Sequence, residues 1–202
     1  MRAPVKALLL AGIFLAGAAV TLHILSEGDG VVMLGDSITA GGRWPQRVDG
    51  AVDRGRSGDT TIKVLQRLDA VPREGRTIFL LIGLNDLRRG ASVEDTAART
   101  AEIVARLAPA RVYLVSTLLT RDPRLNRRIA ALNALNAKGC GGRCVPLDVN
   151  SVLAPEGMLK PEFTYDGFHL SEAGYRAYHQ AIAPAIARTQ AADATQGNLE
   201  SA

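Results

Sequence analysis

Short apolar runs alternate with longer amphipathic runs along most of this chain, and this alternation constrains the fold more than any other feature. Five runs have the character of strands, the second being the weakest: 31–34, 51–52, 77–82, 111–116 and 145–148. Four segments place apolar residues at helical spacing: 60–71, 92–107, 124–137 and 171–187. Strands that alternate with helices predict one α/β domain with a parallel sheet covered on both faces.

The first strand runs directly into Gly35-Asp36-Ser37-Ile38-Thr39. A serine at this point would lie at the carboxyl edge of the sheet, beside the free backbone N–H groups of a helix start, where acyl transfer can take place. Asp36 and Ser37 could instead simply cap the following helix, because both residue types are common caps. The pentapeptide alone does not separate these two interpretations.

Three further motifs support the catalytic interpretation. They are Arg56-Ser57-Gly58-Asp59-Thr60, Gly83-Leu84-Asn85-Asp86 and Asp166-Gly167-Phe168-His169-Leu170-Ser171. Each motif follows a strand-like run or precedes a helix-like one, which predicts that all of them meet at the same edge of the sheet. With these four motifs in this order, the chain resembles the SGNH hydrolases of the GDSL-type esterase and lipase superfamily over residues 31–187.

The resemblance implies a particular fold and a particular set of site residues. The implied fold is a three-layer α/β sandwich around a five-stranded parallel sheet with the flavodoxin-like strand order 2-1-3-4-5. The implied oxyanion hole consists of the backbone N–H groups of Ser37 and Gly58 and the side-chain amide of Asn85. Glycine allows the backbone to approach the substrate closely, and an amide donates without carrying charge.

The residue types also suit a serine esterase on chemical grounds. A serine hydroxyl is a poor nucleophile until a base takes its proton, and the base needs a group that fixes its tautomer. We assign Ser37 as nucleophile, His169 as base and Asp166 as the group that orients His169. The other two histidines, His23 and His179, have no such context. This mechanism requires no metal and no cofactor.

Two other enzyme classes fit the sequence less well. Ordinary α/β-hydrolases carry Gly-x-Ser-x-Gly, whereas Ile38 and Thr39 follow Ser37 here. Nucleotide-binding proteins of similar architecture carry Gly-x-Gly-x-x-Gly or a Walker sequence, and this chain has neither.

The formal net charge is +4, and no aromatic residues alternate with the basic ones, so we expect no nucleic-acid partner. The densest basic run is expected to be a solvated helix face: Arg121, Arg124, Arg127 and Arg128.

Residues 1–25 differ from the rest of the chain. Arg2 and Lys6 precede a long apolar run at 7–25, which predicts a signal peptide or an N-terminal membrane anchor in the form of a transmembrane helix. Cleavage near Ala16-Gly17-Ala18 would leave apolar residues in front of the first strand, which favours the anchor. We therefore expect an exported protein that is anchored facing outside the cytoplasm, or secreted or periplasmic if the segment is cleaved.

The remaining expectations concern organisation and substrate. Residues 26–30 form a linker, 31–187 the hydrolase domain and 188–202 a disordered tail, and the protein is expected to be a monomer. Cys140 and Cys144 could form a small disulfide or remain two free thiols, and they lack the further ligands of a zinc site. Leu118 and Leu119 could line an acyl groove or belong to the core.

The expected substrate is a small ester or an acylated cell-envelope molecule, which makes the enzyme a carbohydrate O-acetylesterase or a lysophospholipase-type lipase. The alternative is a non-catalytic module that binds polysaccharide or protein.

Overall fold

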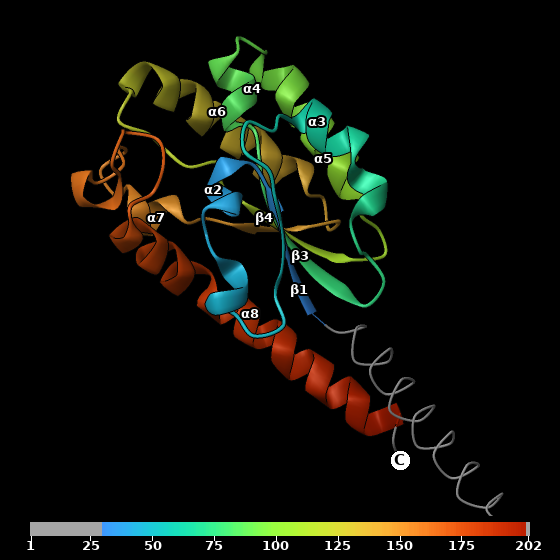
Figure 1. The fold of residues 1–202 in the computed structure, drawn as a ribbon. Helices are drawn as coiled ribbons and strands as arrows, with labels where there is room; N and C mark the ends of the chain where they lie inside the picture. Colours follow the sequence, from blue (N-terminus) through green and yellow to red (C-terminus); the bar gives the residue numbers. More distant parts are fainter. Residues whose placement is uncertain (1–29, 201–202) are drawn as a thin grey trace, which may run out of the picture.

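The computed structural model describes residues 30–200, with side chains as far as residue 191. Its centre is a five-stranded parallel sheet with the strand order β2-β1-β3-β4-β5. The strands are β1 (Gly30–Gly35), β2 (Val52–Gly55), β3 (Arg76–Leu81), β4 (Arg111–Val115) and β5 (Val145–Leu147). The parallel sheet and its strand order confirm the prediction (Figure 1).

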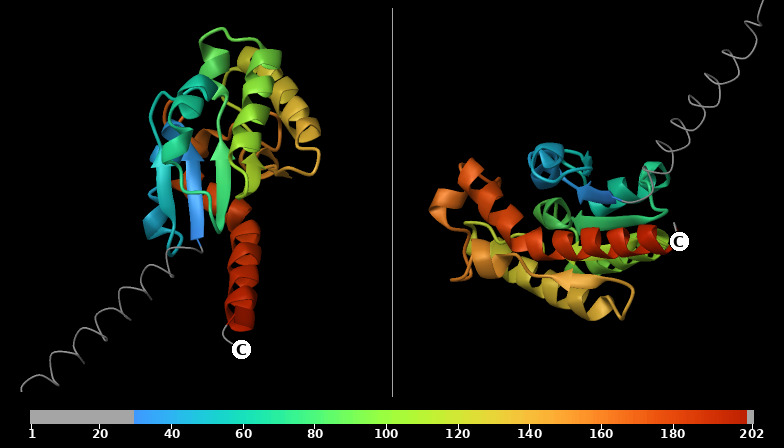
Figure 2. Two further views of the ribbon diagram at one scale, coloured as in Figure 1. Left: turned by 90° about the vertical axis from the view of Figure 1, so that its right-hand side faces the viewer. Right: turned by 90° about the horizontal axis from the view of Figure 1, so that it is seen from below.

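Both faces of the sheet are covered by helices, so that the molecule has three layers (Figures 1 and 2). Alternate residues of a strand point to opposite faces, and both sets are apolar here. Met33, Phe79 and Tyr113 pack with residues of α8 on one face. Leu34 and Leu80 pack on the other face, with residues of α3 and α5. Burial on both sides explains why the central strands β1, β3 and β4 are mostly apolar instead of alternating with polar residues.

Most of the longer helices begin at a polar side chain that accepts hydrogen bonds from the first turn. Thr60, Ser92 and Asp122 cap α3, α5 and α6 in this way. The helices that follow the first strand are α2 (Ser37–Ala40), α3 (Thr61–Gln66), α4 (Leu84–Arg88), α5 (Val93–Arg106), α6 (Pro123–Gly139), α7 (Asn150–Leu153) and α8 (Glu172–Glu200). Short 3₁₀ helices cover Trp44–Gln46, Leu68–Ala70 and Pro161–Phe163.

Two helices differ from the sequence expectation. The helix expected over 60–71 divides at Arg67, whose guanidinium donates to the Asp59 carboxylate and to the carbonyls of Gly35 and Arg54. The last helix was expected to end near 187 with a disordered tail after it, but α8 continues to Glu200. Thr189 is buried there and donates to the Ala185 carbonyl, so the contacts of the helix extend past the expected end.

The apolar segment at 7–25 and the expected linker at 26–30 lie outside the described residues, except for Gly30, which begins β1. Within residues 30–200 no helix is long and apolar enough to cross a membrane. Cys140 and Cys144, the two cysteines, are joined by a disulfide just after α6. Of the two alternatives left open by the sequence, the structure therefore has the disulfide.

Candidate active site

Ser37 lies at the turn from β1 into α2. Asp36 is the N-cap of this short helix, and its carboxylate accepts a hydrogen bond of 3.0 Å from the backbone N–H of Ile38. Gly35 precedes the turn, and a Cβ at this position would overlap the Leu81 carbonyl and the Thr39 hydroxyl. Ser37 thus lies at the carboxyl edge of the sheet, directly after a turn that has no space for a side chain at Gly35.

The structure brings Ser37, His169 and Asp166 together. Ser37 Oγ lies 3.0 Å from His169 Nε2, although the two residues are 132 positions apart in the sequence. His169 Nδ1 lies 2.6 Å from Asp166 Oδ2 on the opposite side of the ring. Hydroxyl, imidazole and carboxylate thus form one hydrogen-bonded chain, which is the arrangement that lets an imidazole accept the proton of an attacking serine.

The loop that carries Asp166 and His169 is held by its own hydrogen bonds. Asp166 Oδ1 accepts from the backbone N–H groups of Phe168 and His169, at 2.9 and 2.8 Å. The Thr164 hydroxyl donates to the His169 carbonyl and accepts from the Gly167 N–H. Gly167 has a φ of +91°, a conformation that favours glycine. These contacts fix the imidazole relative to the carboxylate before any substrate binds.

The two acidic groups nearest Ser37 differ in charge state. Partial burial works to raise the pKa of Asp166, but hydrogen bonds from the His169 imidazole and from two backbone N–H groups lower it to about 2. Asp166 therefore carries a negative charge at neutral pH. Complete burial raises the pKa of Asp36 to about 7, against the opposing hydrogen bond from Ile38. Asp36 is thus only partly charged at neutral pH, and its role as a helix cap rests on its hydrogen bond with the Ile38 N–H.

The candidate oxyanion donors lie on three segments that are tied to one another. The Arg56 N–H donates to the Gly35 carbonyl and so holds the loop of Gly58 beside the end of β1. The Asn85 side-chain amide donates to the Asp59 carbonyl at 3.0 Å, which holds the same loop to α4. Within residues 30–200, the backbone N–H groups of Ser37 and Gly58 donate to no other residue. Both are therefore available to a substrate oxygen.

Other polar residues of the motifs support the loops. The Asp86 carboxylate accepts from the backbone N–H and the hydroxyl of Thr61, at 2.9 and 2.6 Å. Asp59 forms an ion pair of 2.7 Å with Arg67. The contacts of Asp36 and Asp86 thus stabilise the turns that carry them.

Two tyrosines near the site were not identified from the sequence. The ring of Tyr165 stacks on the His169 imidazole with a centroid distance of 5.8 Å, and 72% of Tyr165 is exposed. The Tyr175 hydroxyl, on α8, donates to the Ile38 carbonyl at 2.9 Å and so supports the nucleophile helix. The only sequence signal for Tyr165 was its position next to Asp166, and Tyr175 had none.

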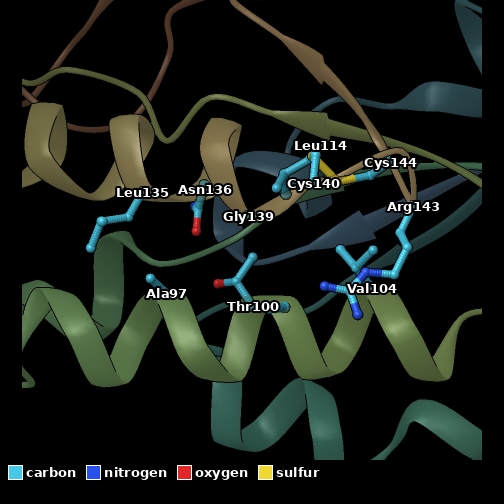
Figure 3. A pocket seen from close by; sticks show the side chains of 11 residues that line it. Ala97, Thr100, Val104, Leu114, Leu135, Asn136, Gly139, Cys140, Arg143 and Cys144 are labelled. Atoms are coloured by element: carbon cyan, nitrogen blue, oxygen red, sulfur yellow. A yellow bond between two sulfur atoms is a disulfide. The ribbon is translucent and has the colours of Figure 1, made fainter.

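Leu118 and a small cavity next to the disulfide do not belong to this site. Leu118 is 1% exposed and belongs to the core, which leaves it unsuited to the suggested acyl groove. A small cavity of about 20 Å³ lies between α5 and α6 next to the disulfide, and none of its lining residues belongs to the four motifs (Figure 3). Among the described residues, no three His, Cys, Asp or Glu side chains are grouped as metal ligands would be.

Comparisons with known proteins find a matching family model and solved structures of similar fold. The model of the GDSL-like Lipase/Acylhydrolase family matches residues 33–177. A GDSL-like lipase from Bacteroides thetaiotaomicron is 24% identical, with a TM-score of 0.68 over 81% of this chain and 89% of that one. A catalytic mutant of Axe2, an acetylxylan esterase from Geobacillus stearothermophilus, is 15% identical, with a TM-score of 0.66 over 79% of this chain and 94% of that one.

Curated proteins match over a shorter segment. N-acylneuraminate cytidylyltransferases of Streptococcus agalactiae are 29% identical over 99 residues, which is 46% of this chain. The chain spans about a quarter of the length of these relatives, since the match covers 24% of them.

Proposed function

This chain belongs to the GDSL-like Lipase/Acylhydrolase family and is an ester-hydrolysing enzyme, and we propose that Ser37 is its nucleophile, His169 its general base and Asp166 the residue that orients the base. The observation that carries the proposal is the continuous chain of hydrogen bonds from Ser37 Oγ through the imidazole to the Asp166 carboxylate. A surface histidine without a catalytic role would not need contacts on both ring nitrogens.

The proposed reaction has two halves. Ser37 Oγ attacks the ester carbonyl carbon while His169 Nε2 takes the hydroxyl proton. The bond to the leaving alcohol then breaks, the alcohol receives that proton, and an acyl group remains on Ser37. Water attacks the acyl-enzyme with His169 again as base, which releases the acid and restores the serine. Asp166 remains ionised throughout and stabilises the imidazolium.

The negative charge that develops on the carbonyl oxygen requires donors that are already in place. The unpaired N–H groups of Ser37 and Gly58, together with the second N–H of the Asn85 amide, are the proposed donors. The loss of one such donor typically costs about 3 to 4 kcal/mol of transition-state stabilisation. Asn85→Ala should therefore lower kcat by about 10²- to 10³-fold, provided the loop of Gly58 keeps its other contacts.

We favour short acyl groups on a carbohydrate as the substrate, with O-acetyl esters first. The loop of Asp166 and His169 lies at the surface, since Asp166 and the neighbouring Tyr165 are exposed. Such an open site suits a small acyl group on a large alcohol. The curated relatives are named for a carbohydrate, N-acylneuraminate, which also favours this class over a lysophospholipid. The burial of Leu118 removes one candidate for an acyl-chain groove.

The experiment that tests the nucleophile is labelling with an organophosphate, followed by peptide mapping. The expected result is stoichiometric modification of Ser37 and loss of labelling and esterase activity in Ser37→Ala. Ser57→Ala is the matched control, because it changes a nearby exposed serine of the second motif. Modification of another serine, or activity in Ser37→Ala, would disprove the assignment.

A panel of p-nitrophenyl esters from acetate to laurate tests the acyl preference. The expected order is a decrease of kcat/KM from acetate to the longer chains. An optimum at a long chain would instead favour the lipase alternative. Turnover of any ester that depends on Ser37 would contradict the non-catalytic binding module.

We further propose that the enzyme is exported and held at the outer face of a membrane by residues 7–25. The Cys140–Cys144 disulfide supports this proposal, because such bonds persist mainly in oxidising compartments. Membrane fractionation and N-terminal sequencing test it. A soluble cytoplasmic product with Met1 retained and two free thiols would refute export.

A further inference from the structure

A second hollow adjoins the catalytic loop and is lined by arginines. It is an open pocket of about 360 Å³ between the end of α4, the start of α6 and the loop that carries His169. Arg88, Arg124 and Arg128 line it, with Asp122 as the acidic residue among the lining side chains. Two leucines and Phe168 provide the apolar part of the wall.

The charges of this pocket do not cancel. Asp122 is occupied as the cap of α6, where it accepts from two backbone N–H groups, and its charge opposes three guanidinium groups. Arg128 donates to the carbonyls of Leu87 and Ala91 and so joins α6 to the end of α4. Neither Arg88 nor Arg124 has a carboxylate partner among the described residues. Two exposed cations therefore face the pocket without a counter-ion from the protein.

Two residues of the pocket lining, Arg88 and Phe168, stand close in the sequence to proposed site residues. Arg88 lies one helical turn after Asn85 on α4, and its guanidinium lies 4.4 Å from the ring centre of Phe168. Phe168 directly precedes His169. This cation–π contact places the Arg88 guanidinium over the aromatic ring, and its N–H groups remain able to donate to a ligand. An ester bound at Ser37 could thus extend from the oxyanion donors past Phe168 to these arginines.

We propose that this pocket binds a negatively charged group, a carboxylate or a phosphate, carried by the ester substrate. The inference rests on the proposed function and narrows its substrate class to acidic esters. Guanidinium groups bind planar carboxylates and phosphates through paired N–H donors, which gives both attraction and orientation. Two of the three arginines, Arg124 and Arg128, belong to the basic run that we expected to be a solvated helix face.

The kinetic test uses matched acidic and neutral acetate esters. 3-Acetoxybenzoate and 4-acetoxybenzoate are compared with their methyl esters, and the ratio of kcat/KM for acid to neutral ester is measured in each variant. We expect the ratio to fall about tenfold in Arg88→Gln/Arg124→Gln, and to approach the same value in wild type at high salt. Arg127→Gln is the control, because Arg127 is exposed on α6 and does not line the pocket. Arg128 is left unchanged because it joins two helices.

A binding test separates the two anion sources. Benzoate and phenyl phosphate are titrated into the Ser37→Ala protein by calorimetry, and the same titrations are repeated with the two arginines also replaced. Binding of either anion that weakens about tenfold on their replacement supports the proposal, and the tighter anion identifies the source.

The outcomes of the two tests differ for the pocket and for the proposed function. An unchanged kinetic ratio with unchanged anion binding would overturn the pocket, even if Ser37 is the nucleophile. An equal loss in Arg127→Gln would also overturn it, because the effect would then be one of net charge. Ester turnover that survives Ser37→Ala would instead overturn the proposed function, whatever the arginines do.

Discussion

The two halves of the catalytic centre are built in opposite ways. The nucleophile half lies in the core: Asp36 and Ile38 on either side of Ser37 are each 1% exposed. The base half lies at the surface, where Asp166 is exposed and Tyr165 stacks against His169 from the solvent side. The position of Ser37 is thus set by sheet and helix packing, whereas that of His169 is set by a few hydrogen bonds within one loop. Substitutions in the first half should affect folding, and those in the second half mainly activity.

The largest effect is expected for His169→Ala. Loss of the base should lower kcat by about 10⁴-fold or more, as in other serine hydrolases that lose a member of the triad. The melting temperature should change little, because the side chain lies on an exposed loop. His179→Ala on α8 is the matched control and should retain full activity. Comparable activity of the two variants in an ester assay would contradict the role of His169.

Gly35→Ala should show the opposite pattern. A methyl group there would overlap the Leu81 carbonyl and the Thr39 hydroxyl, and backbone cannot move aside cheaply. We expect a loss of about 3 kcal/mol or more in the free energy of unfolding, or failure to fold. Gly139→Ala is the control, since a Cβ at that position in α6 has open space and should be neutral or slightly stabilising. Denaturant unfolding of both variants measures the difference, and similar stabilities would break the contrast between the two halves.

Thr164→Val should act on the base half alone. It removes the hydroxyl that donates to the His169 carbonyl and accepts from Gly167 N–H. Since each hydrogen bond contributes about 1 kcal/mol, we expect kcat to fall about tenfold with a decrease of a few degrees in melting temperature. Thr164→Ser retains the hydroxyl and should restore kcat. If Thr164→Val retained full kcat, the packing of the side chain and not its hydrogen bonds would hold the loop.

Asp36→Asn should change the pH dependence of stability. Because burial raises the folded pKa of Asp36 to about 7, the folded state keeps a proton that the unfolded chain loses above its ordinary pKa of about 4. Its contribution to stability therefore falls as pH rises from about 4 to 7, by at most about 1.4 kcal/mol per pH unit. Asparagine keeps the capping oxygen but does not titrate, so melting temperatures at pH 5 and pH 8 should lie closer together in the variant. If the difference between the melting temperatures at pH 5 and pH 8 were the same in the variant as in the wild type, the raised pKa of Asp36 would be contradicted.

Local sequence was enough to predict most of the fold. The expected runs overlap all five strands and agree best at β1, β3 and β4, because residues buried on both faces of a parallel sheet are mostly apolar; the run expected at 51–52 shares only Val52 with β2. The helix starts were readable because caps such as Ser92 are local interactions. The end of α8 was not predicted, since the burial of Thr189 depends on what the helix packs against.

The sequence by itself indicated which chemical groups the candidate site contains, because Ser37, Asn85, Asp166 and His169 stand in motifs whose residue types and order resemble those of the SGNH hydrolases. Only the tertiary structure decided the distance from Ser37 to His169 and the gathering of Arg88, Arg124 and Arg128 around one pocket. The physical reason is that local motifs record short-range constraints such as turns and caps. Contacts between segments more than 30 residues apart exist only once the sheet brings the ends of its strands together.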